Sequence, residues 1–175
     1  MLKFLTIFLL LPYLCFASDG ENPLSDSFDK TFDGWRHYGS GRVQHVSSLG
    51  NKANGALNIS CSAKQQGTLY KKMDLANGLY EVEIALRSFA VKKGLYDYST
   101  WIFYESSAGK TTNVVTNLKG TYEWSKLKFS VEVKDHPLTI WVRLKSEGVI
   151  WMDDFKISKT ASAQKTVFDK STKAF

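Results

Sequence analysis

Apolar and polar residues alternate along most of the chain between residues 42 and 159. The clearest run is 80–87, where Tyr80, Val82, Ile84 and Leu86 would share one face. A period of two places successive side chains on opposite faces of a β-strand. Strands are predicted at 42–46, 56–59, 69–75, 80–87, 100–105, 113–118, 126–133, 138–145 and 149–159.

No helical period separates these runs, and Gly, Asn, Asp and Pro residues mark the turns. About ten short strands without helices predict an all-β fold, an antiparallel β-sandwich (jelly roll) of two sheets. The alternation also predicts which side chains fill the space between the sheets. They are Val82, Ile84, Leu86, Ile140, Val142 and Leu144.

Three segments do not follow the pattern. Residues 88–98 are irregular and are predicted to form a long loop, which carries Tyr96. In 100–105 both alternating rows are aromatic, so the row that faces inward stays undecided. Beyond Lys159 large apolar residues are few, which predicts a tail, residues 160–175, that is either disordered or a short docked helix.

Residues 1–17 have the composition of a signal peptide. Lys3 lies in a short basic start, 4–16 are almost wholly apolar, and Ala17 is the small residue that signal peptidases prefer. The chain is therefore predicted to be secreted or periplasmic, with its domain at 18–159. The apolar run is too short for a bilayer span, so no membrane span is expected. Without Cys15, Cys61 stands alone and is interpreted as a small buried hydrophobe.

The formal net charge of +6 is spread over scattered lysines and arginines. A nucleic-acid binder would show a dense basic run, so no nucleic acid is expected as a partner. A weak attraction to anionic glycans or cell-surface components would suit this charge, although solubility alone would also account for it.

No catalytic constellation is evident. His37, His45 and His136 lack metal-ligand or triad spacing. Glu81 and Glu83 share a strand face about 7 Å apart, within reach of glycosidase geometry. Two glutamates on an exposed strand are more often a solvated face, and the chain is predicted not to be an enzyme.

Two adjacent carboxylates, Asp153 and Asp154, lie within the apolar stretch 150–157. A buried carboxylate needs a partner, which could be a divalent cation, backbone N–H groups or a basic side chain. Alternation could instead leave one Asp in solvent and the other hydrogen-bonded. Asp26, Asp29 and Asp33 gather on a turn-rich segment, either as a solvated acidic loop or as cation ligands.

Four segments resemble one family of domains. Residues 151–157 are similar to the closing strand of the β-sandwich carbohydrate-binding modules of families 4, 9, 16 and 22, which are galactose-binding-domain-like. Phe28-Asp29 followed by Gly34-Trp35 is similar to their opening. Weaker matches, in the same order, are Gly78-Leu79-Tyr80 and Tyr122-Glu123-Trp124. The resemblance implies core positions for Trp35 and Trp124, and one structural calcium held by Asp29 and Asp153, with Asp154 as the alternative second carboxylate.

Aromatic side chains are the main candidates for a binding site. In 138–145 Trp141 shares a row with Arg143 and other polar residues, and indole planes stack on the apolar faces of sugars. The alternative is that the 88–98 loop or the tail covers Trp141. The resemblance implies that the row of Arg87 and Glu83 lies in the same concave sheet as Trp141.

The predicted function is non-catalytic binding of an oligo- or polysaccharide on the concave face of an exported sandwich. The alternative is a secreted protein-interaction or adhesion module with a protein or cell-surface partner. The candidate ligand-binding residues are Trp141, Arg143, Arg87, Glu83, Trp101 and Tyr96.

Overall fold

The structure is a computed structural model that describes residues 24–28, 31–52, 55–94, 99–107, 109–115 and 117–169. These residues form strands, turns and loops, and no helix occurs among them. The proposed signal peptide, Asp29 and Tyr96 lie outside the described residues. No helix in the described part is long and apolar enough to cross a membrane.

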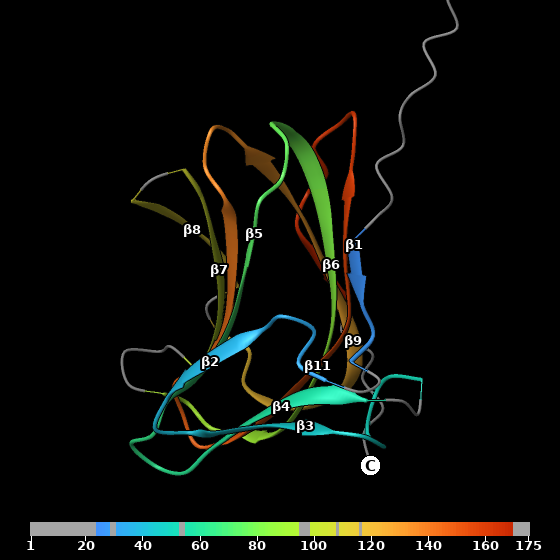
Figure 1. Cartoon of the computed structure of the whole chain (residues 1–175). Helices are drawn as coiled ribbons and strands as arrows, with labels where there is room; N and C mark the ends of the chain where they lie inside the picture. The colour runs from blue at the N-terminus through green and yellow to red at the C-terminus, as the bar shows by residue number, and fades with distance from the viewer. Residues whose placement is uncertain are drawn as a thin grey trace, which may run out of the picture.

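Two antiparallel sheets face each other (Figure 1). The first has seven strands in the order β12-β9-β6-β11-β4-β3, with β1 paired to β11. Its strands are β1 (Leu24–Asp26), β3 (Arg42–Val46), β4 (Ala56–Cys61), β6 (Gly78–Val91), β9 (Gly120–Val133), β11 (Gly148–Lys159) and β12 (Val167–Asp169).

The second sheet has five strands in the order β2-β5-β10-β7-β8. They are β2 (Arg36–Gly39), β5 (Gly67–Met73), β7 (Thr100–Ser107), β8 (Lys110–Val115) and β10 (Leu138–Leu144). This arrangement confirms the predicted all-β sandwich of two sheets.

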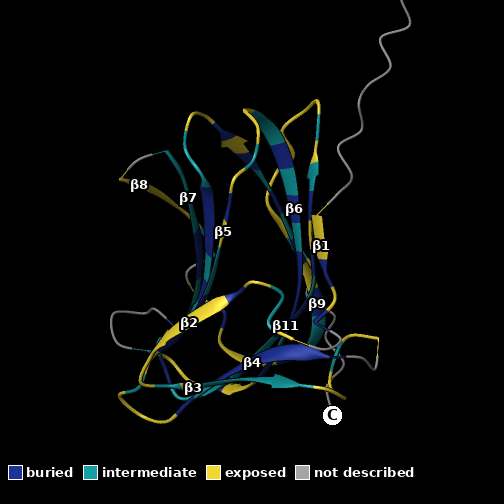
Figure 2. Cartoon of the chain, in the orientation of Figure 1, coloured by how far each residue is buried: buried dark blue, intermediate teal, exposed yellow. Residues whose placement is uncertain are grey.

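The core lies between the sheets. Every side chain predicted to be inside is buried: Val82, Ile84, Leu86, Ile140, Val142 and Leu144. Figure 2 shows buried residues along β4, β6 and β7 and exposed residues along β2. Removing this apolar surface from water is the main source of the fold's stability. Trp35 is buried as expected, in edge contact with Phe28 and Phe155, whereas Trp124 is only half-buried.

The loop predicted to begin at Ser88 is a strand as far as Val91, which corrects that interpretation. Two register shifts between β6 and β9, after Leu86 and after Ser88, interrupt the period of two. Ser88 is buried and its hydroxyl donates to the carbonyl of Gly120. Bulges of this kind disrupt the local alternation from which a strand is recognised.

The segment after Lys159 also differs from both expectations. Residues 167–169 form β12, which pairs with β9 at the edge of the seven-stranded sheet. The ring of Phe168 makes an edge contact with Tyr122, with 5.7 Å between the ring centroids. Part of the predicted tail therefore belongs to the sandwich.

Candidate functional site

The outer face of the five-stranded sheet carries an array of aromatic side chains. On β10 the inward residues are buried, whereas Trp141 and Arg143 point outward and are half-buried. Trp141 pairs with Phe103 and Arg143 with Trp101, so the outward row of β7 continues that of β10. We call the surface formed by Tyr38, Tyr70, Trp101, Phe103, Trp141 and Arg143 the aromatic face.

The structure decides which row of β7 faces outward. Ile102 is completely buried between the sheets, and Tyr104 stacks on the core residue Phe129. Trp101 and Phe103 therefore lie on the aromatic face, although Phe103 is only 5% exposed. Neighbouring rings cover Phe103 on its outer side.

The three rings form a continuous stack. Phe103 and Trp141 are parallel within 8°, with ring centroids 4.8 Å apart. Trp101 and Phe103 are tilted by 33°, with centroids 4.4 Å apart. Aromatic pairs at such separations are favourable beyond the area they bury, so these contacts stabilise the arrangement of the three rings.

Arg143 lies at the centre of the aromatic face. Its guanidinium carbon is 5.3 Å from the ring centroid of Trp101, 5.1 Å from that of Phe103 and 5.7 Å from that of Tyr38. The guanidinium donates hydrogen bonds to the hydroxyls of Thr68, at 3.0 Å, and of Tyr38. These bonds use two of its five N–H groups, and the others can donate to a ligand.

Polar groups border the array. The indole N–H of Trp101 donates to the Asn113 side chain at 2.8 Å, and the ammonium of Lys145 lies 5.0 Å from the Trp101 ring centroid. Glu105 follows Phe103 in the outward row of β7, and its carboxylate lies 3.5 Å from the imidazole of His136. An apolar platform with hydrogen-bonding groups at its edge is suited to a ligand that has both C–H faces and hydroxyls.

Arg87 and Glu83 do not lie beside Trp141, which corrects the expectation of a shared sheet. They are on β6, which pairs with β9 and β11 in the seven-stranded sheet, whereas β10 belongs to the other sheet. Both point away from the core, so the sandwich separates them from the aromatic face. We call the surface formed by Glu81, Glu83, Arg87, Glu123, Lys126, Lys128 and Trp151 the charged face.

Ion pairs connect the side chains of the charged face. The ammonium of Lys128 lies 2.5 Å from Glu83 and 3.7 Å from Glu81, and that of Lys126 lies 3.1 Å from Glu83. Partial burial raises the pKa of Glu83, but Lys128 and Lys126 outweigh this and the net pKa is lowered from 4.5. A general acid needs a raised pKa, so Glu83 is poorly suited to that role.

The two carboxylates of the closing stretch have different environments. Asp153 is completely buried and accepts backbone N–H groups from Asn51 and Asp154, each at 2.7 Å. Asp154 has a positive φ of 45° beside a register shift in β11, and it accepts the Asn51 side-chain amide at 2.9 Å. Lys52 lies 3.4 Å from Asp154. Of the three kinds of partner predicted for a buried carboxylate, backbone N–H groups are therefore present at Asp153.

The resemblance predicts one calcium ion held by Asp29 and Asp153, with Asp154 as the alternative second carboxylate. Within the described residues no group of three or more His, Cys, Asp or Glu side chains is arranged to hold a metal ion. Asp29 lies outside those residues, so the predicted set of ligands stays untested. The buried oxygens of Asp153 are of the hard type that calcium prefers.

Asp26 of the acidic segment has a structural role. Its carboxylate accepts the ammonium of Lys71 at 2.6 Å and the indole N–H of Trp35 at 3.1 Å. The side chains of Lys71 and Asp26 are only 12% and 7% exposed. This ion pair connects the opening segment to β5. Removing either partner would leave the other charge buried and unpaired, which is strongly destabilising.

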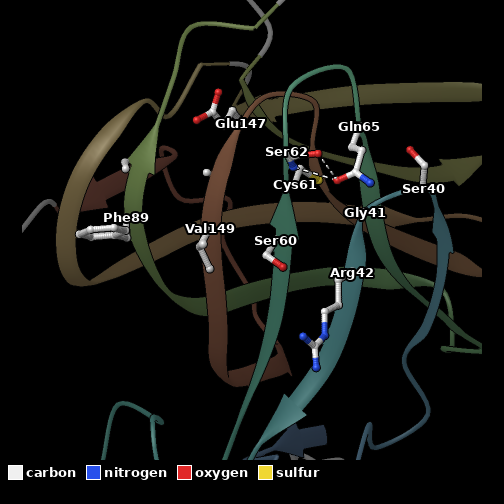
Figure 3. A pocket seen from close by; sticks show the side chains of 12 residues that line it. Ser40, Gly41, Arg42, Ser60, Cys61, Ser62, Gln65, Phe89, Glu147 and Val149 are labelled. Carbon is white, nitrogen blue, oxygen red and sulfur yellow. Dashed lines mark hydrogen bonds between the residues drawn. The ribbon is translucent and has the colours of Figure 1, made fainter.

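A shallow pocket of about 620 Å³ lies beside the charged face, and Figure 3 shows the residues around it. Phe89, Val149, Ser60 and Arg42 form a row across β6, β11, β4 and β3. Phe89 is 58% exposed and, among the described residues that line this pocket, is the one aromatic side chain. Cys61 lies in the wall, and burial raises its pKa from 9.0 to about 11, so the thiol is unreactive at neutral pH as expected for a packing residue.

The sequence did not indicate several members of the aromatic face. Tyr38 lies outside the predicted strands, and Tyr70 lies on a predicted strand for which alternation did not predict an outward face. The same holds for Asn113, which borders the aromatic face. Alternation within 36–39 and 67–73 could have suggested the two tyrosines, but their position beside Arg143 depends on the pairing of β2 with β5 and β5 with β10.

No protein-family model matches the sequence, and no curated protein matches it. The fold, in contrast, matches solved structures of carbohydrate-binding modules. One is the family 22 module and GH10 module of a Clostridium thermocellum endo-1,4-beta-D-xylanase in complex with xylohexaose, with a TM-score of 0.60 and 18% identity over 79% of this chain. The match spans 28% of that longer chain.

Two smaller structures match over most of their length. A family 61 module in complex with β-1,4-galactotriose has a TM-score of 0.57 and 20% identity, over 72% of this chain and 88% of that one. A xylan-binding family 22 domain from Paenibacillus barcinonensis has a TM-score of 0.57 and 16% identity, over 80% of this chain and 95% of that one. The chain therefore has the β-sandwich fold of these modules.

Proposed function

We propose that this protein binds an oligo- or polysaccharide on the aromatic face and does not hydrolyse it. The observation that supports this most directly is the stack of Trp101, Phe103 and Trp141 with Arg143 across it. Sugar rings present apolar C–H surfaces that stack on indole planes, and the guanidinium supplies donors for hydroxyl oxygens. The rings and the guanidinium hold one another in place through their mutual contacts, which lowers the entropic cost of binding.

The solved structures suggest which glycans to test first. Those of similar fold contain xylohexaose or β-1,4-galactotriose, or are described as xylan-binding. Xylan and β-1,4-galactan are therefore suitable first polymers. Another structure of similar fold is the enzymatically active domain of a bacteriophage tailspike, so the fold by itself does not determine whether a protein is an enzyme.

The decisive experiment compares three aromatic variants by affinity gel electrophoresis and calorimetry. Trp141→Ala should weaken glycan binding by about 1–3 kcal/mol, by analogy with the loss of one stacked base. Trp151→Ala, on the charged face, is the matched control and should bind as the parent does. Phe89→Ala tests the other exposed aromatic surface, which Figure 3 shows beside the shallow pocket.

The melting temperature of each variant separates a lost ligand contact from a lost fold. A folded Trp141→Ala variant with unchanged affinity would rule out the aromatic face, and a loss confined to Phe89→Ala would move the site to the other sheet. If the parent binds no glycan but retains a specific protein, the protein-interaction alternative is favoured instead.

We also propose a structural calcium held by Asp29 and Asp153, with Asp154 as the alternative second carboxylate, and export directed by residues 1–17. Support for calcium is the complete burial of the Asp153 carboxylate, whose charge a divalent cation would offset. Support for export is the apolar run before Ala17. N-terminal sequencing of protein recovered from outside the cell would test the cleavage site.

A further inference from the structure

The outer faces of the two sheets differ in their balance of charge. On the charged face the basic side chains are paired with Glu81, Glu83 and Glu123. The outward rows of β2, β5, β7 and β10 instead carry three cations and one carboxylate, which are Arg36, Lys72, Arg143 and Glu105. The aromatic face therefore lies on a surface with an excess of positive charge, which attracts anions.

Arg36 and Lys72 are neighbours at the β2 edge of this surface. The ring of Tyr38 contacts that of Tyr70 on the outer side, so Arg36, two residues before Tyr38, faces the same way. Lys72 follows Tyr70 in the outward row of β5. Because Arg36 pairs with Tyr70, it is a diagonal neighbour of Lys72, at a separation of about 7–8 Å in the sheet. Two side chains of this length can reach one anionic group between them.

Neither of these two cations has a partner in the part of the chain that the structure describes. Arg36 and Lys72 are exposed, and neither makes an ion pair or a side-chain hydrogen bond there. Lys71 differs, because it points to the other side of β5 and is bound to the buried carboxylate of Asp26. Of the two adjacent lysines, Lys71 therefore has a structural role and Lys72 is accessible to a ligand.

The carboxylates around this edge do not offset the two charges. Asp74, which follows β5, is exposed and forms no ion pair with Lys72 among the described residues. Glu105 lies two strands away from Lys72, on the far side of β10. Its carboxylate has its own partners, the imidazole of His136 at 3.5 Å and the backbone N–H of Gly109 at 3.0 Å.

Tyr70 connects this edge to the stacked rings. It pairs with Arg36 on β2 and with Trp141 on β10, so the three residues form one row across the sheet. Two strand spacings separate Arg36 from Trp141, which is about 9–10 Å along the sheet. A glycan that lies on Trp141 and extends across β5 would bring its substituents to Arg36 and Lys72.

We propose that Arg36 and Lys72 bind the anionic group of an acidic polysaccharide, a uronate carboxylate or a sulfate ester, whose neighbouring rings lie on the aromatic face. This inference rests on the proposed function and specifies the class of glycan. The planar guanidinium can hold such a group through two parallel N–H bonds, and the ammonium adds a second positive charge beside it.

The ligands for the test are pairs of polymers that differ only in charge. Glucuronoxylan and polygalacturonate are each compared with the same polymer after its carboxylates have been reduced to alcohols. Dextran sulfate is compared with dextran. The charged polymers that bind more tightly than their neutral forms identify the anionic group as a carboxylate or a sulfate ester.

The test variant is Arg36→Gln/Lys72→Gln, and the matched control is Arg42→Gln/Lys156→Gln. Arg42 lies on the edge strand β3 and Lys156 on β11, both in the seven-stranded sheet. Both are exposed and have no ion pair among the described residues, so the control removes the same charge from the other sheet. Gel retardation at two salt concentrations measures affinity, and melting temperatures confirm folding.

We expect the parent to bind at least one acidic polymer more tightly than its neutral form. The test variant should lose roughly five- to tenfold in affinity for that polymer, the scale of two exposed ion pairs. The control variant should lose much less, and high salt should reduce the difference between the two. Affinity for the neutral polymers should not change in either variant.

Three results would overturn the inference: equal losses in both double variants, no loss in the test variant, or acidic and neutral forms that bind equally well. Each of them leaves the proposed function intact if Trp141→Ala still weakens binding. If Trp141→Ala changes binding to no polymer of either kind, the proposed function itself fails.

Discussion

Both outer faces of the sandwich have an arginine beside a tryptophan, but the two arginines have different partners. Arg87 lies 5.4 Å from the ring centroid of Trp151 and also 3.3 Å from the carboxylate of Glu123. Arg143 lies over Trp101 and Phe103, and its described hydrogen bonds are to the hydroxyls of Tyr38 and Thr68.

This difference distinguishes a cationic side chain with a structural role from one that is a candidate for binding a ligand. Glu123 offsets the charge of Arg87, and Lys126 and Lys128 likewise pair with Glu83. No ion pair to Arg143 occurs among the described residues, so its charge is available to a ligand. A cation over an aromatic ring is therefore weak evidence for a site until its carboxylate partners are known.

The largest expected effect tests whether the same core supports both faces. Ile84 lies beneath the charged face and Ile140 beneath the aromatic face, and both are completely buried. Replacing either with Ala should lower the free energy of unfolding by about 2–5 kcal/mol, measured by urea denaturation. A loss below about 0.5 kcal/mol for one of them, the range of surface changes, would mean that its sheet packs differently.

Calcium should affect stability without affecting the aromatic face. If calcium binds only the folded protein, a hundredfold excess over Kd raises stability by about 2.7 kcal/mol. Thermal melts with calcium and with a chelator measure this, starting from metal-free protein. Glycan affinity should stay the same in both, since Asp153 lies on β11 of the other sheet. Superimposable melts would argue against the site.

The two arginines can be compared directly in binding. Arg143→Lys keeps the charge but loses the planar group that lies over two rings and donates to Tyr38 and Thr68. We expect glycan affinity to fall by about 0.5–2 kcal/mol, the scale of one cation–π contact. Arg87→Lys is the control and should leave calorimetric affinity unchanged. Equal losses would remove the distinction between the faces.

The smallest effect concerns the ion pairs of the charged face. Because the pKa of Glu83 is lowered in the folded protein, its pairing stabilises the fold above its unfolded pKa. That contribution is lost as the pH falls through the lowered value. Lys128→Gln should move the pKa of Glu83 upward, as measured by NMR titration of its carboxyl carbon. An unchanged titration would show that Lys128 does not hold Glu83 in solution.

Alternation predicted the sandwich, its core and the outward direction of Trp141, because each depends only on the period within one strand. It could not show that Arg87 and Trp141 lie on different sheets, since strand pairing depends on distant residues. Bulges interrupt the alternation in β6, so the end of that strand was not predicted. Both rows of β7 are aromatic, so only the burial of Ile102 in the structure shows which row faces inward. The positions of Tyr38 on β2 and Tyr70 on β5 beside Arg143 depend on the pairing of distant strands, which the sequence pattern does not predict.

The central position of β10 has a consequence for how binding preferences could change. Its neighbours β5 and β7 hold the backbone on both sides, and Ile140, Val142 and Leu144 anchor it from beneath. Residues 139, 141 and 143 of β10, and residue 145 directly after it, can therefore be varied while their neighbours in the chain maintain the fold. A library randomised at these four positions would explore new binding preferences on an unchanged scaffold, so one short segment is accessible to both natural diversification and engineering.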